Sequence, residues 1–189
     1  SDIGLITPEV KEAGLDMVPT SSTINQLSIG DALAVSTLKK RRINNLDFKK
    51  FHPSGSLGEK LKTAEDLMLT KDKIPFIDES KLMTKALKIM TEKKLGTLIV
   101  RNKKRYTTGI ITDGQIRRFN SKNINLNSLQ VKDVMTKNPI KIDKNILATK
   151  ALAIMNEKKI TSLCVYEKKK KFFTIGILHI HNILNKKIY

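Results

Sequence analysis

The sequence predicts an α/β protein in which one β-α-β-β-α unit occurs twice in tandem, after a helical N-terminal segment. The chain has 189 residues, of which 40% are hydrophobic, enough for the core of one ordinary domain or two small ones. The duplication is visible in residues 84–100, which match residues 149–165 at an offset of 65 with 11 of 17 positions identical. We therefore expect these two segments to fold alike.

Further matches extend the repeat to a unit of about 60 residues. Residues 64–68 (Ala-Glu-Asp-Leu-Met) correspond to residues 131–135 (Val-Lys-Asp-Val-Met), and Thr107-Thr-Gly-Ile corresponds to Thr174-Ile-Gly-Ile. The expected parts are an N-terminal segment at 1–63, a first copy at 64–127 and a second copy at 128–189.

Each copy contains one amphipathic helix. Its apolar residues recur with the spacing i, i+3, i+4, i+7, which places them on one face of a helix. These positions are Met83, Ala86, Leu87 and Met90 in the first copy, and Ala148, Ala151, Leu152 and Met155 in the second.

Short runs rich in β-forming residues follow each helix and predict a hairpin. A proline opens an extended piece before each helix, and a last helix closes each copy. The hairpins are expected at 96–100 and 106–112 around a polar turn at 101–105, and at 162–166 and 172–178 around a lysine tip at 168–171; the prolines are Pro75 and Pro139, and the last helices begin near Asp113 and Ile180.

The N-terminal segment is not part of the repeat. Hydroxyl side chains in Pro19-Thr-Ser-Ser-Thr23 are expected to cap a helix at 24–42, whose apolar face would carry Ile24, Leu27, Ala34, Val35 and Leu38. Asp31 lies on or beside that face, where a hydrogen-bonded structural carboxylate is favoured over a functional one. A Gly, Ser and Pro loop follows at 51–58 and carries His52.

The net charge of +18 is unevenly distributed: residues 1–63 carry +2 and residues 64–189 carry +16. A nucleic-acid footprint would need these charges on one face, interleaved with aromatic side chains that stack on bases. Aromatic residues make up only 5% of the chain and Trp is absent. A compositional drift toward Lys is therefore favoured over attraction for small anions, and both are favoured over nucleic-acid binding.

The single cysteine, Cys164, excludes a disulfide framework and a multi-cysteine zinc site, and it is expected to be a buried thiol. No apolar run reaches the length of a membrane span, and no signal-peptide pattern begins the chain. These observations predict a cytoplasmic protein without a membrane partner, and they point to no metal site and no required cofactor.

The duplicated unit resembles the cystathionine β-synthase (CBS) domain in its Asp-Leu-Met or Asp-Val-Met entry, its Met-Thr-Glu-Lys-Lys helix end and its Gly-Ile-Ile-Thr-Asp exit. Two such units in tandem resemble a Bateman module, which implies a regulatory receiver that can bind an adenine or other nucleotide between the copies. The resemblance implies ligand contacts near Thr112, Asp113, Gln115, His179 and Asn182.

The chain departs from the family pattern at the residue that holds the ribose. The family commonly has Asp three residues after the Thr, whereas this chain has Gln115 and, in the second copy, Asn182. A neutral amide is a weaker acceptor for ribose hydroxyls than a carboxylate. We therefore expect weak adenosine binding, and three alternatives stay open: nucleotide sensing, a purely structural or oligomerising pair, and another anionic ligand.

The order of motifs along the whole chain resembles the carboxyl end of arabinose 5-phosphate isomerases. These motifs are Lys11-Glu-Ala, Val18-Pro-Thr-Ser-Ser-Thr, Gly30-Asp-Ala-Leu-Ala-Val, Phe51-His-Pro-Ser-Gly-Ser-Leu-Gly and the Bateman module. The resemblance implies a sugar isomerase (SIS) enzyme that interconverts ribulose 5-phosphate and arabinose 5-phosphate for octulosonate, in lipopolysaccharide or capsule synthesis. It implies a homo-oligomer, a dimer or tetramer, with an adenine or cytidine nucleotide or a nucleotide sugar as effector.

Aldose–ketose isomerisation needs a base and an acid near two adjacent carbons. The resemblance assigns these roles to His52 and Glu12, although Ser54 stands where the family usually has Gly. No phosphate-binding loop leading into a helix is found in residues 1–63. We therefore expect the C-terminal regulatory portion of an isomerase, inactive alone; the alternative is a stand-alone CBS-pair module without enzymatic activity.

Overall fold

The computed structural model describes residues 3–52, 54–122, 124–186 and 188. The chain divides into two compact units, residues 1–48 and 49–189, and each is described by itself. Within the described residues, no helix is long and apolar enough to cross a membrane.

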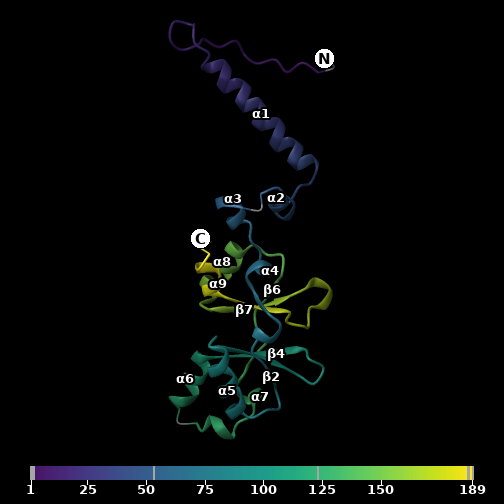
Figure 1. Ribbon diagram of the computed structural model, residues 1–189, viewed down its shortest axis with the longest axis vertical. Coiled ribbons are helices and arrows are strands. Elements are labelled where there is room, and N and C mark those ends of the chain that lie inside the picture. Colours follow the sequence, from purple (N-terminus) through teal and green to yellow (C-terminus); the bar gives the residue numbers. More distant parts are fainter. Residues whose placement is uncertain (1–2, 53, 123, 187, 189) are drawn as a thin grey trace. The chain divides into compact units, whose positions relative to one another are not determined.

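The first unit contains the predicted N-terminal helix as α1 (Ser21–Lys40; Figure 1), followed by the start of α2 (Asn45–Phe51). The predicted hydroxyl cap is wrong, because no side chain at the N-cap residue Thr20 bonds to the helix. The backbone N–H groups of Ser21 and Ser22 donate instead to the carboxylate of Glu12. A carboxylate satisfies these unpaired donors and also complements the positive end of the helix.

The apolar face of α1 is not buried against any other described residue. Ile24 and Leu27 are 64% and 65% exposed, and α1 contains no buried residue. Asp31 is exposed as well, and the expected structural hydrogen bond to its carboxylate is not found among the described residues.

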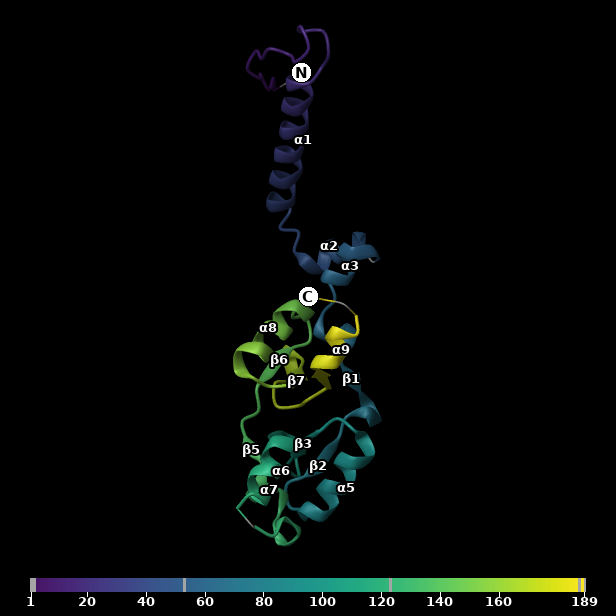
Figure 2. The same ribbon diagram turned by 90° about the vertical axis from the view of Figure 1, so that its left-hand side faces the viewer.

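The second unit contains both copies of the predicted repeat, and each copy has the predicted order of elements (Figures 1 and 2). Short helices α3 (Gly55–Lys60) and α4 (Ala64–Leu67) come first. The first copy continues with β1 (Leu69–Thr70), β2 (Phe76–Asp78), α5 (Met83–Lys93), β3 (Thr97–Arg101), β4 (Thr107–Thr112) and α6 (Asp113–Asn120). The second contains α7 (Val131–Val134), β5 (Thr136–Lys137), β6 (Lys141–Asp143), α8 (Ala148–Lys158), β7 (Ser162–Tyr166), β8 (Gly176–His179) and α9 (Ile180–Leu184).

The strands in the described residues form two four-stranded sheets, ordered β2-β3-β4-β5 and β1-β8-β7-β6. In each sheet the strand before the long helix pairs in parallel with the strand after it, and the predicted hairpin is antiparallel. Helices α5 and α6 lie beside the first sheet and α8 and α9 beside the second (Figure 2).

The two copies exchange their first segments. Strand β1 of the first copy pairs with β8 of the second, and β5 of the second copy pairs with β4 of the first. The backbone N–H of Ala64 donates to Ile146 O, and that of Val131 donates to Lys81 O, both at 2.8 Å. Each hydrophobic core is therefore completed by a helix from the other copy, α4 or α7.

The second hairpin is shorter than the sequence predicts, because residues 172–175 do not continue as a strand. Thr107 N–H donates to the carbonyl of Phe172 at 2.8 Å, and Thr174 N–H donates to the hydroxyl of Thr107 at 3.2 Å. Residues 172–174 thus lie against the first hairpin, and β8 begins only at Gly176.

Candidate functional site

A cavity of about 620 Å³ lies between the two copies. Its volume is in the range of small-molecule sites. The first turn of α6 contributes one wall, residues 136–140 before β6 contribute another, and the start of α9 a third. The lining residues are Lys94, Leu95, Gly96, Ile110, Thr112, Asp113, Gly114, Gln115, Arg117, Arg118, Thr136, Asn138, Pro139, Ile140, Ile160, Thr161, Ser162, His179 and His181.

Gln115, one of the predicted ligand residues, holds the start of α6 against the second copy. Its Oε1 accepts from the backbone N–H of Thr112 at 2.8 Å, and its Nε2 donates to the hydroxyl of Thr136 at 2.5 Å and to Val134 O at 3.3 Å. The amide thus supplies donors that a carboxylate in this place could not. Its polar atoms are engaged within the protein, so Gln115 is poorly suited to hold a ribose.

The equivalent residue in the second copy, Asn182, caps α9. Its Oδ1 accepts from the backbone N–H of His179 at 3.0 Å, and Asn182 does not line the cavity. The ring of His179 does line it, 5.0 Å from the ring of His181. Burial, with a smaller effect from the neighbouring His181, lowers the pKa of His179.

Asp113 occupies the first position of α6 and is exposed at the cavity. Its backbone N–H donates to the carbonyl of Gly96 at 3.0 Å, and a Cβ added to Gly96 would lie 2.5 Å from the Asp113 Oδ2. Gly96 also has φ of +59°, which favours glycine. Gly96 thus makes room for the Asp113 carboxylate, to which no described side chain donates a hydrogen bond.

The cavity is cationic. Lys94, Arg117 and Arg118 line it, whereas Asp113 is the one acidic residue in its described lining. The sequence reasoning missed the two arginines, although their position one turn after Asp113 on the same helix would have placed them at its edge. Three cations against one carboxylate favour an anionic ligand.

Glu12, a predicted catalytic residue, lies in the first unit. Its Oε2 accepts from the backbone N–H groups of Thr20 and Ser21 at 2.6 and 2.7 Å and from the Thr20 hydroxyl at 2.9 Å. Hydrogen bonds from Ser22, and next from the Thr20 backbone, lower the pKa of Glu12 to about 2. The side chain is therefore ionised at neutral pH and serves as the cap of α1 in this structure.

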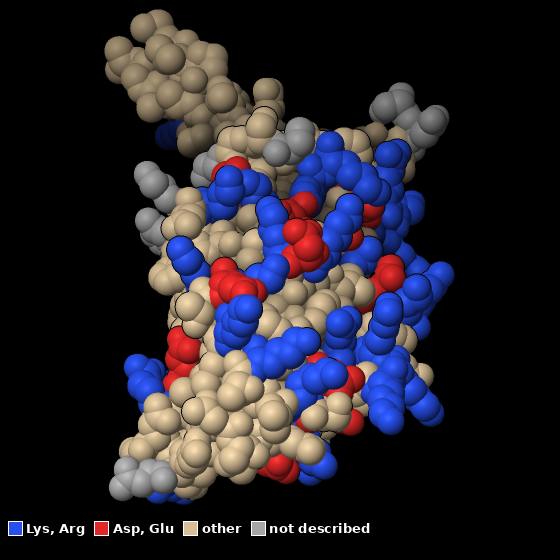
Figure 3. Space-filling view, turned by 60° about the horizontal axis from the view of Figure 1, so that its bottom comes forward, with Lys and Arg blue, Asp and Glu red and all other residues tan. Residues whose placement is uncertain are grey.

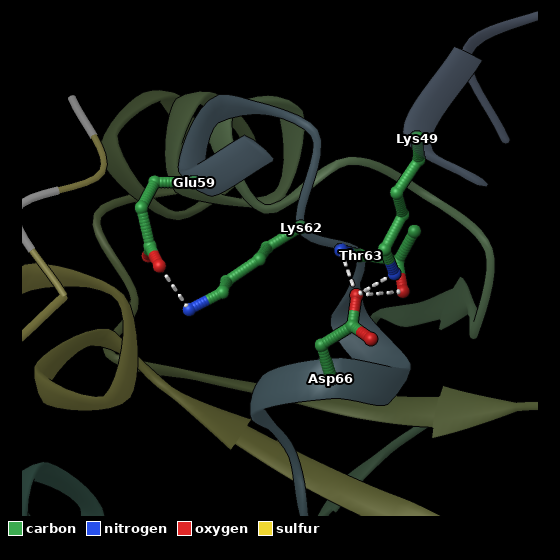
Figure 4. A network of polar contacts seen from close by, with 5 residues as sticks. All are labelled: Lys49, Glu59, Lys62, Thr63 and Asp66. Carbon is green, nitrogen blue, oxygen red and sulfur yellow. Dashed lines mark hydrogen bonds and ion pairs between the residues drawn. The ribbon is translucent and has the colours of Figure 1, made fainter. Parts of the chain in front are cut away.

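His52, the other predicted catalytic residue, is exposed between α2 and α3 in the second unit. Pro53 of the same motif lies outside the described residues. The side chains around this segment form a polar network (Figure 4). The Nζ of Lys49, on α2, lies 2.5 Å from the carboxylate of Asp66 on α4. The Nζ of Lys62 lies 2.6 Å from the carboxylate of Glu59.

Asp66 is the centre of this network. Its carboxylate accepts hydrogen bonds from the backbone N–H of Thr63 at 2.6 Å and from the Thr63 hydroxyl at 2.8 Å. These two hydrogen bonds cap the N-terminus of α4. Partial burial raises the pKa of Asp66, but hydrogen bonds from Lys49 and Thr63 outweigh it, and the pKa is lowered overall. The segment that carries His52 is thus tied to the helix that completes the core of the second copy.

No cluster of three or more His, Cys, Asp or Glu residues in the described part of the chain could hold a metal ion. The family model of the CBS domain matches residues 64–122 and 131–188, which together are more than half of the chain. The chain belongs to the CBS domain family. The arrangement of its two sheets agrees with solved CBS pairs: CBSX2 of Arabidopsis thaliana in complex with AMP has a TM-score of 0.58 at 22% identity, covering 67% of this chain and 96% of that one.

The resemblance to arabinose 5-phosphate isomerases is confirmed. The CBS protein is 38% identical to the arabinose 5-phosphate isomerase KdsD of Escherichia coli over 97% of its length. It is 37% identical, over 98% of its length, to the uncharacterized protein RP505 of Rickettsia prowazekii. In each case it spans 56% of the relative, so the chain corresponds to about half of the curated relatives it matches.

Proposed function

We propose that the CBS pair is the ligand-sensing module of an arabinose 5-phosphate isomerase, and that its cavity binds a phosphorylated nucleoside. The observation that carries this proposal is the cavity between the copies, with Lys94, Arg117 and Arg118 against the single carboxylate of Asp113. Cations of this kind match a phosphate, and guanidinium groups can bind it in a bidentate manner. The AMP in the CBSX2 complex supports an adenine nucleotide.

Asp113 is our candidate for the ribose contact. Its carboxylate lies at the cavity without a donor among the described residues, whereas Gln115 is engaged with Thr112 and Thr136. A carboxylate can accept hydrogen bonds from both ribose hydroxyls. In this proposal the carboxylate that the family carries at the third position of α6 is replaced by one at the first position.

The experiment uses two ligands that differ only in the ribose hydroxyls, AMP and 2′,3′-dideoxy-AMP. Loss of a charge-assisted hydrogen bond should weaken AMP binding to Asp113→Asn roughly tenfold. The dideoxy nucleotide should bind the variant no more weakly than the unaltered chain, because Asp113 only repels its phosphate. An equal loss for both ligands in calorimetric titrations would show that Asp113 does not hold the ribose.

The catalytic part of the proposal concerns Glu12 and His52. We propose that they act in proton transfer once a SIS core positions the sugar phosphate, since positioning supplies much of the rate of such reactions. Glu12 can take part only if the substrate displaces one of the donors that now cap α1 with it. His52 lies in a segment fixed to α4 by Lys49, so a ligand in the module can influence it through α4.

An activity assay tests the catalytic proposal. The chain alone should not interconvert arabinose 5-phosphate and ribulose 5-phosphate, and supplying the part of Escherichia coli KdsD that it does not span should restore turnover. His52→Gln should then abolish turnover, whereas Lys150→Gln, at an exposed position on α8 outside the cavity, should retain it. Turnover by the complemented His52→Gln variant would show that His52 does not transfer the proton, and no turnover by the complemented unaltered chain would favour a stand-alone CBS module.

We further propose that the protein works in the cytoplasm as a homo-oligomer, in lipopolysaccharide or capsule synthesis. A cytidine-linked sugar acid is the second candidate effector, because it also combines an anionic phosphate with a ribose. The KdsD relatives support the pathway, since they share 38% identity with the chain. Competition between this compound and AMP for the cavity would separate the two effectors.

A further inference from the structure

The two hairpin loops of the CBS pair meet and form a basic surface that the separate sequence segments do not reveal. Thr107 N–H donates to Phe172 O at 2.8 Å, and the rings of Tyr106 and Phe172 stack with centroids 5.3 Å apart. Both loops project on the same side of the module in Figure 1. Seven exposed cations lie at these loops; they are Lys103, Lys104, Arg105, Lys168, Lys169, Lys170 and Lys171.

The acidic residues near this surface have partners of their own. The Glu167 carboxylate lies 3.4 Å from Lys144 Nζ, and Asp78 accepts from the Ser80 hydroxyl at 2.6 Å. The two loops project to the right in Figure 1. Figure 3 shows Lys and Arg side chains gathered along the right-hand edge of the molecule. Seven loop cations outnumber these two carboxylates, so the surface presents concentrated positive charge to a polyanion.

Aromatic residues directly follow these cations in the chain, because Tyr106 comes after Arg105 and Phe172 after Lys171. Phe172 is 64% exposed although one side of its ring contacts Tyr106, and the ring of Phe173 packs edge-on against Tyr106 at 5.1 Å. The chain contains only six Phe and three Tyr, so three of its nine aromatic residues meet at this one place. An exposed ring of this kind can stack on a base of either nucleic acid.

A hollow of about 580 Å³ opens beside the rings. Tyr106 and Phe172 contribute to its wall together with the exposed Lys132 and Lys137, and Asn102 provides an amide at its edge. Its acidic residues are engaged: Glu79 accepts from the Thr108 hydroxyl at 2.9 Å, and Asp133 from Gln130 N–H at 3.2 Å. The hollow can thus take one nucleotide with its base against the rings and its phosphate near the lysines.

We propose that this surface, the seven loop cations with Tyr106, Phe172 and the hollow, binds single-stranded nucleic acid. The sequence alone argues against such a partner because aromatic residues are few, but the fold places a third of them among the cations. Single strands are favoured over a duplex because their bases are free to stack. An anionic membrane is the less favoured partner, because the Phe172 ring stacks on Tyr106 rather than projecting alone into solvent.

Fluorescence anisotropy with labelled oligo(dT) and oligo(U) tests the proposal on the full chain. With about five phosphates contacted, the logarithm of the binding constant should fall with the logarithm of the salt concentration with a slope of roughly −3.5. Phe172→Ala should weaken binding roughly five- to a hundredfold by removing a stacked base. Phe172 is exposed, so the variant should keep the melting temperature of the unaltered chain.

Two charge-matched variants separate a specific surface from bulk charge. Replacing Lys168, Lys169 and Lys170 by Gln should cost more than tenfold in affinity at physiological salt. Replacing the exposed Lys85, Lys88 and Lys150, on helices α5 and α8, should change it less than twofold. Equal losses in both triple variants, an unchanged affinity of Phe172→Ala, tighter binding to a duplex, or binding to phosphatidylserine vesicles but not to oligonucleotides would each overturn the proposal.

Discussion

The hydroxyl oxygens of Thr97 and Ser162 lie 3.2 Å apart, and both side chains are buried at the interface between the two copies. The two residues occupy equivalent positions, 65 apart in sequence. Thr107 and Thr174, which are also equivalent, are hydrogen-bonded in the same way at 2.8 Å. Contacts between equivalent residues are what an axis of two-fold pseudosymmetry between the copies produces.

The Thr97–Ser162 pair should contribute to stability as a unit. Ser162→Ala leaves the buried Thr97 hydroxyl without its partner, which should lower the free energy of unfolding by about 1–3 kcal/mol. Replacing both, with Thr97→Val and Ser162→Ala, should cost less than the sum of the single changes. Urea unfolding measures these values, with Ser36→Ala on the exposed face of α1 as control; additive losses would show that the two hydroxyls do not interact.

The exchanged segments should depend on two glycines. A Cβ on Gly109 would clash with the Met135 side chain, and one on Gly176 with that of Met68. Gly109→Ala and Gly176→Ala should each destabilise the second unit by about 1–3 kcal/mol, because the inserted methyl group overpacks the site. Gly30→Ala, where nothing lies within 4 Å, is the matched control and should not lower the thermal midpoint.

If alanine at both positions left the midpoint unchanged, the methionines would have room to move. The close packing of α4 and α7 in the other copy would then be wrong.

The sequence was sufficient for the order of elements but not for their partners. The apolar spacing of Met83, Ala86 and Met90 predicted α5, and all three residues are buried. It could not show that α4 and α7 cross to the other copy, because two similar copies offer both helices equivalent surfaces. Which copy each helix packs on depends on backbone contacts such as the hydrogen bond from Ala64 N–H to Ile146 O.

The residues at the cavity were predictable only in part, because the equivalent residues Gln115 and Asn182 make different contacts in the two copies. Thr112, Asp113, Gln115 and His179 line the cavity, whereas Asn182 does not. The contacts of Gln115 with Thr136 and Val134 depend on a segment 19–21 residues away, which no local motif indicates. The capping role of Glu12 was hidden for the same reason, since its donors are eight to ten residues ahead.

Helix α1 should lose its cap in acid. The pKa of Glu12 is lowered from 4.5 to about 2, so ionised Glu12 stabilises the folded state above about pH 4.5, and this contribution is lost as the pH falls toward 2. Glu12→Gln should reduce the helical signal at neutral pH and flatten its dependence between pH 5 and 2. Circular dichroism measures both, with Glu9→Gln as control; identical pH profiles for Glu12→Gln and the unaltered chain would contradict the cap.

The contact between Lys49 and Asp66 should restrain the segment that carries His52. Lys49→Gln should speed thermolysin cleavage within residues 51–62, because α2 loses its charged contact with α4. The melting temperature should change little, since partly exposed ion pairs contribute about 0–1 kcal/mol. Lys60→Gln removes a cation from the same segment and should leave cleavage unchanged; equal cleavage rates in both variants would argue against the restraint.

The most direct test of ligand binding between the copies is calorimetric titration with AMP of three proteins: the unaltered chain, Arg117→Gln/Arg118→Gln and Arg41→Gln/Arg42→Gln. Both variants remove two adjacent arginines, but only the first pair lines the cavity. The unaltered chain and the Arg41/Arg42 variant should bind AMP alike, and the Arg117/Arg118 variant should bind it at least tenfold more weakly. No binding by the unaltered chain at millimolar AMP, or the same affinity in all three proteins, would contradict a nucleotide site in this cavity.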